Sequence, residues 1–250
     1  MAEDALQNPV EEKEMTIWDH ISELRARLLK AIGAMVITTV ACIVYLAPKM
    51  IEWLAAPAGG LDKFVAIEVT ETVGVYMRVA LLGGFIMSLP IIVYQILAFV
   101  VPGLYDNEKR WLFIAIPVAT LLFISGVAFS YYVMLPAAIP FLRGFLEDVT
   151  PAWRLANYVG FTTNLMFWIG ASFEAPLVVY IMAKFNIVNA RMLLKQWRFA
   201  VVIIAVIAAM ITPTVDPVNM ALLMMPLFGI YLLSVLFAAL ARANKKDEAA

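Results

Sequence analysis

The sequence has little charge and few of the residues on which catalytic and metal sites depend. Of its 250 residues, 15% are charged and 64% are hydrophobic, and there is one histidine and one cysteine. A soluble domain is usually about half apolar and about a quarter charged. The composition therefore indicates an integral membrane protein. The lone Cys42 excludes an intrachain disulfide, and its apolar surroundings are typical of a small buried side chain.

The sequence also lacks the motifs of the common enzyme classes. It has no Cys/His metal-ligand spacing, no glycine-rich phosphate loop and no nucleophile elbow. The single histidine, His20, falls in a predicted surface helix, where a solvated role is more common than a catalytic one. We therefore expect no enzymatic activity and no metal or other cofactor, and nothing points to nucleic acid.

The two ends of the chain differ from the apolar middle. Residues 1–15 are polar and acidic, so we expect a disordered tail and no cleavable signal peptide, because a signal peptide begins with basic residues. From residue 16, apolar residues recur at helical spacing and predict an interfacial helix that leads into the membrane. Residues 16–240 are expected to form one membrane domain, and 241–250 a second polar tail.

Six apolar segments predict an all-α membrane fold with six transmembrane helices. They cover about 30–47, 72–101, 111–136, 161–185, 197–212 and 219–240. A bilayer core about 30 Å thick needs about 20 helical residues. The fifth segment is shorter, about 24 Å at 1.5 Å per residue, so we expect the bilayer to thin there or neighbouring helices to shield it. No internal repeat is evident, which counts against an inverted-repeat transporter.

The distribution of lysine and arginine predicts the orientation. Thirteen of these residues fall on one side, within 13–30, 109–110, 184–198 and 242–246. Four fall on the other side: Lys49, Lys63, Arg143 and Arg154. The side richer in positive charge is cytoplasmic. Both termini and the loop containing Glu108 are therefore predicted to be cytoplasmic, and the loops at about 48–71 and 137–160 to lie outside.

A carboxylate near the middle of the fourth segment is the sharpest functional signal. Glu174 precedes Pro176, which cannot donate a backbone amide and should kink the helix. Burying a charge at the bilayer centre costs about 2.5–3.5 kcal/mol or more, so such residues are functional by default. Glu174 could be a protonated or paired residue that locks helices together, a proton-coupling group, or a docking point for a partner helix.

Three further polar residues are weaker candidates. Asp216 lies in the short last outer loop near Thr212, and an ordinary turn residue or helix cap is an equally good interpretation of this aspartate. Arg78 lies about two turns inside the second segment and is expected to extend outward, towards Glu71.

Several motifs taken together resemble the TatC family, the multi-spanning subunit of the twin-arginine protein translocase. His20, Glu23, Arg25 and Arg27 match the family's opening motif. The first cytoplasmic loop and the helix before it are matched by Pro90, Tyr94, Gln95, Phe99, Pro102, Leu104, Tyr105 and Glu108. Further matches are Gly126, Phe129, Tyr132 and Pro136, then Phe173, Glu174 and Pro176, then Thr212, Pro213 and Asp216. The sequence departs from the family at Met220 and Leu232, where polar residues are common, and at Arg78, where lysine is common.

The resemblance implies a curved, glove-like fold and a receptor function. Such proteins bind twin-arginine signal peptides of folded cargo, and the resemblance assigns that role to Glu23 and Glu108 with Arg25, Phe99, Pro102, Leu104 and Tyr105. It implies that Glu174, Pro176, Thr212 and Asp216 serve contacts with single-span TatA and TatB type subunits. Further copies of the chain and the lipid bilayer are also expected partners, and the bacterial inner membrane the expected location.

Elementary chemistry supports carboxylates as receptors for paired arginines. Each guanidinium can donate two parallel hydrogen bonds to one carboxylate, a geometry that lysine cannot copy. The alternative interpretation is a secondary transporter with Glu174 as its proton site, and a membrane enzyme ranks third.

Overall fold

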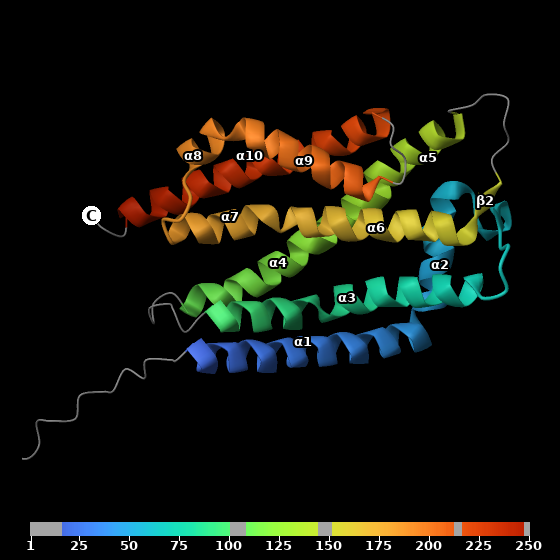
Figure 1. Ribbon diagram of the computed structural model, residues 1–250, viewed down its shortest axis with the longest axis horizontal. Coiled ribbons are helices and arrows are strands. Elements are labelled where there is room, and N and C mark those ends of the chain that lie inside the picture. Colours follow the sequence, from blue (N-terminus) through green and yellow to red (C-terminus); the bar gives the residue numbers. More distant parts are fainter. Residues whose placement is uncertain (1–16, 101–108, 145–151, 213–216, 248–250) are drawn as a thin grey trace, which may run out of the picture.

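Long helices run between the two ends of the molecule (Figure 1). The computed structural model describes residues 17–100, 109–144, 152–212 and 217–247. In chain order the elements are α1 (Ile17–Tyr45), α2 (Ala47–Ala55), the 3₁₀ helices η1 (Ala56–Ala58) and η2 (Leu61–Lys63), β1 (Phe64–Val65), α3 (Glu71–Val100), α4 (Lys109–Phe129), the π-helix η5 (Ser130–Met134), α5 (Leu135–Gly144), β2 (Trp153–Arg154), α6 (Leu155–Phe173), α7 (Ala175–Lys184), α8 (Ala190–Lys195), α9 (Trp197–Ile211) and α10 (Pro217–Asp247).

The expected six-helix membrane fold is confirmed. Five stretches of the described chain are long and apolar enough to cross a membrane: Trp18–Tyr45, Glu71–Phe99, Ile114–Gly144, Leu155–Lys184 and Met220–Ala241. The remaining span, α9, is the fifth in chain order; it has 15 residues and a length of about 22 Å. It is therefore shorter than the hydrocarbon core of a bilayer, as its sequence indicates.

The first helix differs in its bounds from the predicted segment. The interfacial helix and the first span form one unbroken helix, α1, which begins at Ile17 and not near residue 30. The predicted outer loop at 48–71 contains another helix, α2, which follows Leu46 with Pro48 in its first turn. Proline is tolerated there because amides of the first turn have no partner within the helix.

The third span contains a π-helix that the sequence does not reveal. Ser130–Met134 joins α4 to α5 and inserts a wider turn into an otherwise continuous helical stretch. Tyr131 within it is buried, stacks on Trp53 of α2 at 3.6 Å between ring centroids, and donates a hydrogen bond to the Trp53 carbonyl. The wider turn thus lies where the third span meets α2.

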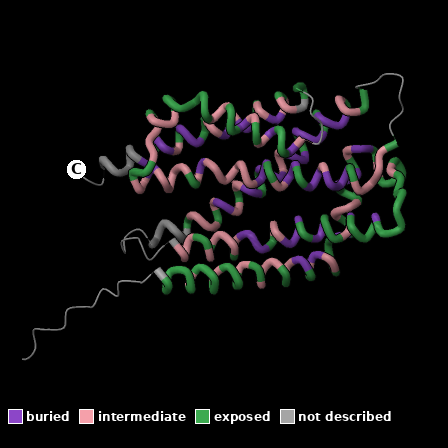
Figure 2. The backbone as a smooth tube through the Cα atoms, in the orientation of Figure 1, coloured by how far each residue is buried: buried purple, intermediate pink, exposed green. Residues whose placement is uncertain are grey.

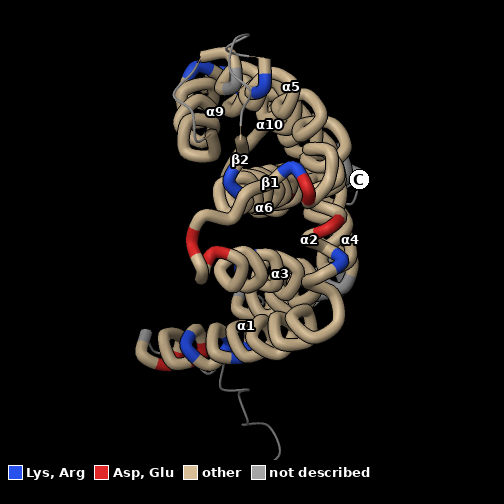
Figure 3. The backbone as a smooth tube through the Cα atoms, turned by 90° about the vertical axis from the view of Figure 1, so that its right-hand side faces the viewer, with Lys and Arg blue, Asp and Glu red and all other residues tan. Residues whose placement is uncertain are grey.

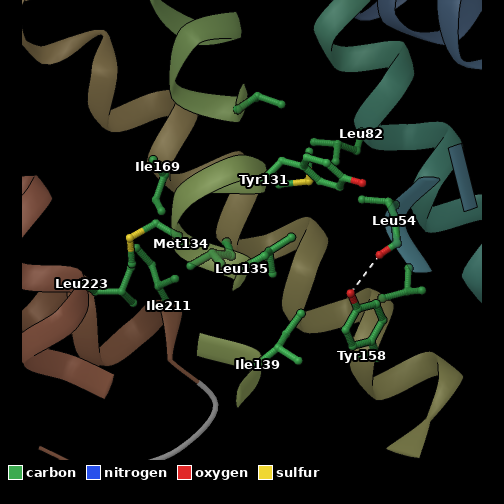
Figure 4. Packing of buried hydrophobic residues seen from close by; sticks show 14 of the residues in the cluster. Leu54, Leu82, Tyr131, Met134, Leu135, Ile139, Tyr158, Ile169, Ile211 and Leu223 are labelled. Carbon is green, nitrogen blue, oxygen red and sulfur yellow. Dashed lines mark hydrogen bonds between the residues drawn. The ribbon is translucent and has the colours of Figure 1, made fainter. Parts of the chain in front are cut away.

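The helices follow a curve when viewed along their length, with α6 near its centre and α1 at one edge (Figure 3). Helix α1 packs mainly on α3, and most of its surface is exposed (Figure 2). The main core lies between α3, the third span, α6 and the last two helices. Figure 4 shows part of it, with Met134 and Ile169 near Ile211 and Leu223, and the Tyr158 hydroxyl donating to the Leu54 carbonyl at 2.8 Å.

The two ends of the molecule hold different elements. We call the end with the start of α1, the end of α3 and α8 the α1 end (Figure 1). The opposite end, which we call the α2 end, holds α2 and a parallel pair of short strands in which Phe64 pairs with Trp153. The strands connect two chain segments that the sequence predicts as outer loops.

Candidate functional site

An aromatic stack joins α1 to α3 at the α1 end. The imidazole of His20 lies on the ring of Phe99, with 4.3 Å between centroids and 22° between planes. His20 is in the first turn of α1, and Phe99 is in the last turn of α3. The stack brings the N-terminal motif beside the end of α3, which directly precedes residues 101–108 in the sequence. Two regions that the sequence singled out separately are therefore neighbours.

Glu23 shares the face of α1 that carries His20, because residues three and seven apart lie together on a helix. Its side chain is 22% exposed and is engaged by Arg27 one turn further on. The Arg27 Nε and one terminal nitrogen both donate to Glu23 Oε1, at 2.8 and 2.5 Å. Arg25 is exposed and lies on a different face of the helix. The four-residue spacing places the two side chains on neighbouring turns of one face, as the ion pair requires.

Gln95 lies one turn before Phe99, on the same face of α3. Its side-chain oxygen, Oε1, is buried and accepts no hydrogen bond within the described part of the chain. Such an atom has a hydrogen-bonding capacity that is normally satisfied in proteins. Pro102, Leu104, Tyr105 and Glu108 lie outside the described residues, so their assignment to this site remains a prediction.

The seam between α1 and α3 determines where Glu23 lies. At Gly84 the two backbones meet so closely that a Cβ there would lie 2.6 Å from the Cα of Thr39. Thr38 donates its hydroxyl proton to the Gly84 carbonyl at 2.8 Å, and Tyr76 donates to the Ile43 carbonyl at 2.7 Å. These contacts hold the C-terminal half of α1, and the His20–Phe99 stack holds its beginning.

Glu174 interrupts the fourth span, as Pro176 predicts. Helix α6 ends at Phe173 and α7 begins at Ala175, so Glu174 is the junction residue. Its side chain is partly buried, and its Oε1 is buried and has no hydrogen-bond partner among the described residues. A carboxyl oxygen can accept a hydrogen bond or, when protonated, donate one, so Oε1 has hydrogen-bonding capacity that the described residues do not use.

Thr212 and Asp216 are not brought to Glu174 by any contact that the structure describes. The Thr212 hydroxyl donates to the Ala208 carbonyl of its own helix at 2.9 Å, which satisfies it locally at the end of α9. Asp216 lies outside the described residues. The predicted grouping of these polar residues into one partner site therefore remains a prediction.

An apolar cavity of about 470 Å³ lies between α6 and α7 on one side and α9 and α10 on the other. Its walls include Trp168, Ala175, Ile204, Leu227 and Tyr231. The sequence did not predict this cavity, since its residues come from five separate helices, α6 to α10.

The α2 end contains a cluster of charges that corrects one of our expectations. Glu71 does not meet Arg78. It accepts hydrogen bonds from Arg154 Nε at 2.8 Å and from the Ala156 amide at 2.8 Å, while Arg154 also pairs with Glu68 at 2.7 Å. The two carboxylates, Glu71 foremost, hold the pKa of Arg154 above its usual value.

Arg78 instead extends across to α6. Its guanidinium lies against Gly160, where no side chain blocks it. Its predicted partner was wrong, because Glu71 is already engaged at the start of α6.

These features define a multi-spanning α-helical membrane protein whose α1 end combines an aromatic stack with a partly buried carboxylate. The sequence model described as Sec-independent protein translocase protein (TatC) matches residues 19–226. The chain therefore belongs to the TatC family and is a subunit of the twin-arginine translocase.

Named relatives cover nearly the whole chain. The Sec-independent protein translocase protein TatC of Synechocystis is 35% identical over 231 residues, which are 92% of this chain and 90% of the relative. The TatC protein of Deinococcus radiodurans is 35% identical over 248 residues, 96% of this chain and 92% of the relative. A crystal structure described as the twin arginine translocase receptor TatC has a TM-score of 0.79 at 32% identity, covering 89% of this chain and 99% of that one.

Proposed function

We propose that this subunit binds twin-arginine signal peptides of folded proteins at the α1 end, which faces the cytoplasm. The observation that carries the proposal is the engagement of Glu23 by a guanidinium. Arg27 donates two hydrogen bonds to this carboxylate, beside the His20–Phe99 stack. A peptide arginine could make the same contact, and its aliphatic or apolar neighbours could lie on the adjacent aromatic rings.

The orientation rests on charge. The α1 end carries most of the basic residues of the sequence, and positively charged segments are retained in the cytoplasm. Both termini would then be cytoplasmic, in the inner membrane of a bacterium. Glu108, which directly precedes α4, is the second carboxylate of the proposed site. Two carboxylates could each take one of the paired arginines, which explains a preference for arginine over lysine.

The same subunit would assemble with single-span partners and with further copies of itself through its membrane-embedded surface. Glu174 supports this proposal, because its Oε1 is buried without a hydrogen-bond partner in the described chain. The cavity beside the short α9 supports it too, since an apolar helix could cover its walls. No catalytic step is needed for either role.

A peptide-binding measurement tests the proposal. The full-length protein in lipid nanodiscs is titrated with a fluorescent twin-arginine signal peptide and with a version carrying Lys-Lys. We expect tighter binding of the arginine peptide and weaker binding by Glu23→Gln and Glu108→Gln. Glu52→Gln, an exposed carboxylate at the α2 end, is the matched control. Equal binding by Glu23→Gln, Glu108→Gln and the wild type would contradict the assignment of the site.

A further inference from the structure

The ligand position at Glu23 is already occupied by a residue of the same helix. Arg27 reaches back one turn, and both of its hydrogen bonds end on Oε1 of Glu23. No hydrogen bond described in the structure ends on Oε2. The pair is partly shielded, with side-chain exposures of 24% for Arg27 and 22% for Glu23. A bidentate guanidinium contact uses both oxygens of a carboxylate, so an incoming arginine cannot form one while Arg27 holds Oε1.

We propose that Arg27 is an intramolecular competitor for the receptor carboxylate. In the empty receptor it compensates the charge of Glu23, and a twin-arginine peptide binds by displacing it. The inference rests on the proposed function, because it concerns the same carboxylate and the same class of ligand. It adds a regulatory element: Arg27 sets an affinity threshold that weakly bound cationic segments do not reach.

Because Arg27 and Glu23 are on the same helix, Arg27 always stays close to the carboxylate. Arg27 lies four residues from Glu23 on the same helix, so the pair reforms whenever a ligand leaves. Paired residues at this spacing on exposed helices interact only weakly, so a ligand with two arginines can displace Arg27 from Glu23. Every ligand that binds Glu23 must break the same Glu23–Arg27 ion pair, so the free-energy cost is the same for each ligand. Arg27 should therefore lower the affinity for arginine and lysine peptides by the same factor and leave their ratio unchanged.

A structural role for Arg27 predicts the opposite result. If the ion pair only holds the Glu23 side chain in its binding rotamer, removing Arg27 leaves the carboxylate free to rotate and weakens peptide binding. Removing any positive charge also reduces general repulsion of a cationic peptide. The direction of the change in affinity distinguishes competition from positioning. The effect of general charge removal needs a control variant, and Lys30 provides it. Lys30 is exposed on α1 close to Arg27 and makes no ion pair in the described structure.

The test uses the full-length protein in nanodiscs and titrates twin-arginine and Lys-Lys peptides into five forms. These are the wild type, Arg27→Gln, Lys30→Gln, Glu23→Gln and the double variant Glu23→Gln/Arg27→Gln. We expect Arg27→Gln to bind both peptides about two- to fivefold more tightly than the wild type, the range given by releasing a weak to moderate ion pair. Lys30→Gln should gain much less.

The double variant decides between competition and simple charge removal. Once Glu23 is neutral there is nothing to compete for, so Arg27→Gln should add no more than Lys30→Gln does. Weaker binding by Arg27→Gln would overturn the proposal in favour of positioning, and an equal gain with and without Glu23 would overturn it in favour of general repulsion. If Glu23→Gln binds like the wild type, the assignment of Glu23 itself fails, which is a separate result.

Discussion

Replacing Gly84 by alanine is expected to separate α1 from α3. At this point of the seam a Cβ would lie 2.6 Å from Cα and 2.7 Å from N of Thr39. Carbon atoms in contact prefer about 3.5–4.0 Å, so the new methyl group is about 1 Å too close. The obstacle is backbone within a helix and cannot rotate away. One helix must therefore move, and the hydrogen bond from Thr38 to the Gly84 carbonyl must lengthen or break.

The expected cost follows from two opposing effects. Inserting a methyl group into a closely packed site usually destabilises a protein by about 1–3 kcal/mol. Alanine is the better helix former by up to about 1 kcal/mol, which offsets part of this. Because the clash is with backbone, we take the upper end of the cost, about 3 kcal/mol, and expect a net loss of about 2 kcal/mol. Gly74→Ala is the matched control on the same helix, because nothing lies within 4 Å of a Cβ there. It should leave stability unchanged or raise it slightly.

The single cysteine provides the assay. Cys42 is fully buried against Ala47 and Ala80, between α1, α2 and α3. A thiol-reactive dye that fluoresces on coupling will label it only when the helices part, so the midpoint temperature of labelling reports on this seam. Gly84→Ala should lower the midpoint by several degrees relative to Gly74→Ala. Equal midpoints for the two variants would show that α1 and α3 do not approach as closely as described.

Three further substitutions test other parts of the structure. Tyr158→Phe removes a buried hydrogen bond to the Leu54 carbonyl and should cost about 1 kcal/mol, seen as a lower labelling midpoint; an unchanged midpoint would mean that the bond contributes nothing. Glu71→Gln should speed tryptic cleavage after Arg154, which loses its best-shielded partner, and an unchanged rate would contradict this role of Glu71. Glu174→Gln should keep the wild-type midpoint, because its Oε1 has no hydrogen-bond partner among the described residues, but should reduce co-purification of single-span partners; a lower midpoint would reveal a structural role instead.

The sequence was informative wherever a property depends on neighbours along the chain. Hydropathy gave the six spans, including the short α9, and Pro176 predicted the interruption at Glu174. The continuity of α1 was missed because a polar surface stripe and an apolar run follow one another without a break signal. The π-helix at Ser130–Met134 was missed because no residue type marks the extra turn.

The site depends more on contacts between distant segments, and these could not be predicted from spacing. Glu71 and Arg154 lie in different predicted loops, so the nearer Arg78 was the natural but wrong partner. The Glu23–Arg27 pair is local and could have been proposed from its four-residue spacing. The roles of Glu108 and Asp216 stay predictions, since both lie outside the described residues.

The attachment of α1 connects the packing of the membrane domain to the proposed receptor site. Only 11% of the membrane-spanning window of α1 is buried, so few neighbours restrain it. It approaches α3 closely at Thr39, where no Cβ would fit on Gly84, and the His20–Phe99 stack holds the other end. Thr39 lies about 24 Å along the helix axis from Glu23. A shift of the helix at Gly84 must therefore either tilt α1 or break the stack. Either change moves Glu23 relative to Phe99, so the geometry of the carboxylate depends on packing at a glycine far along the helix from it.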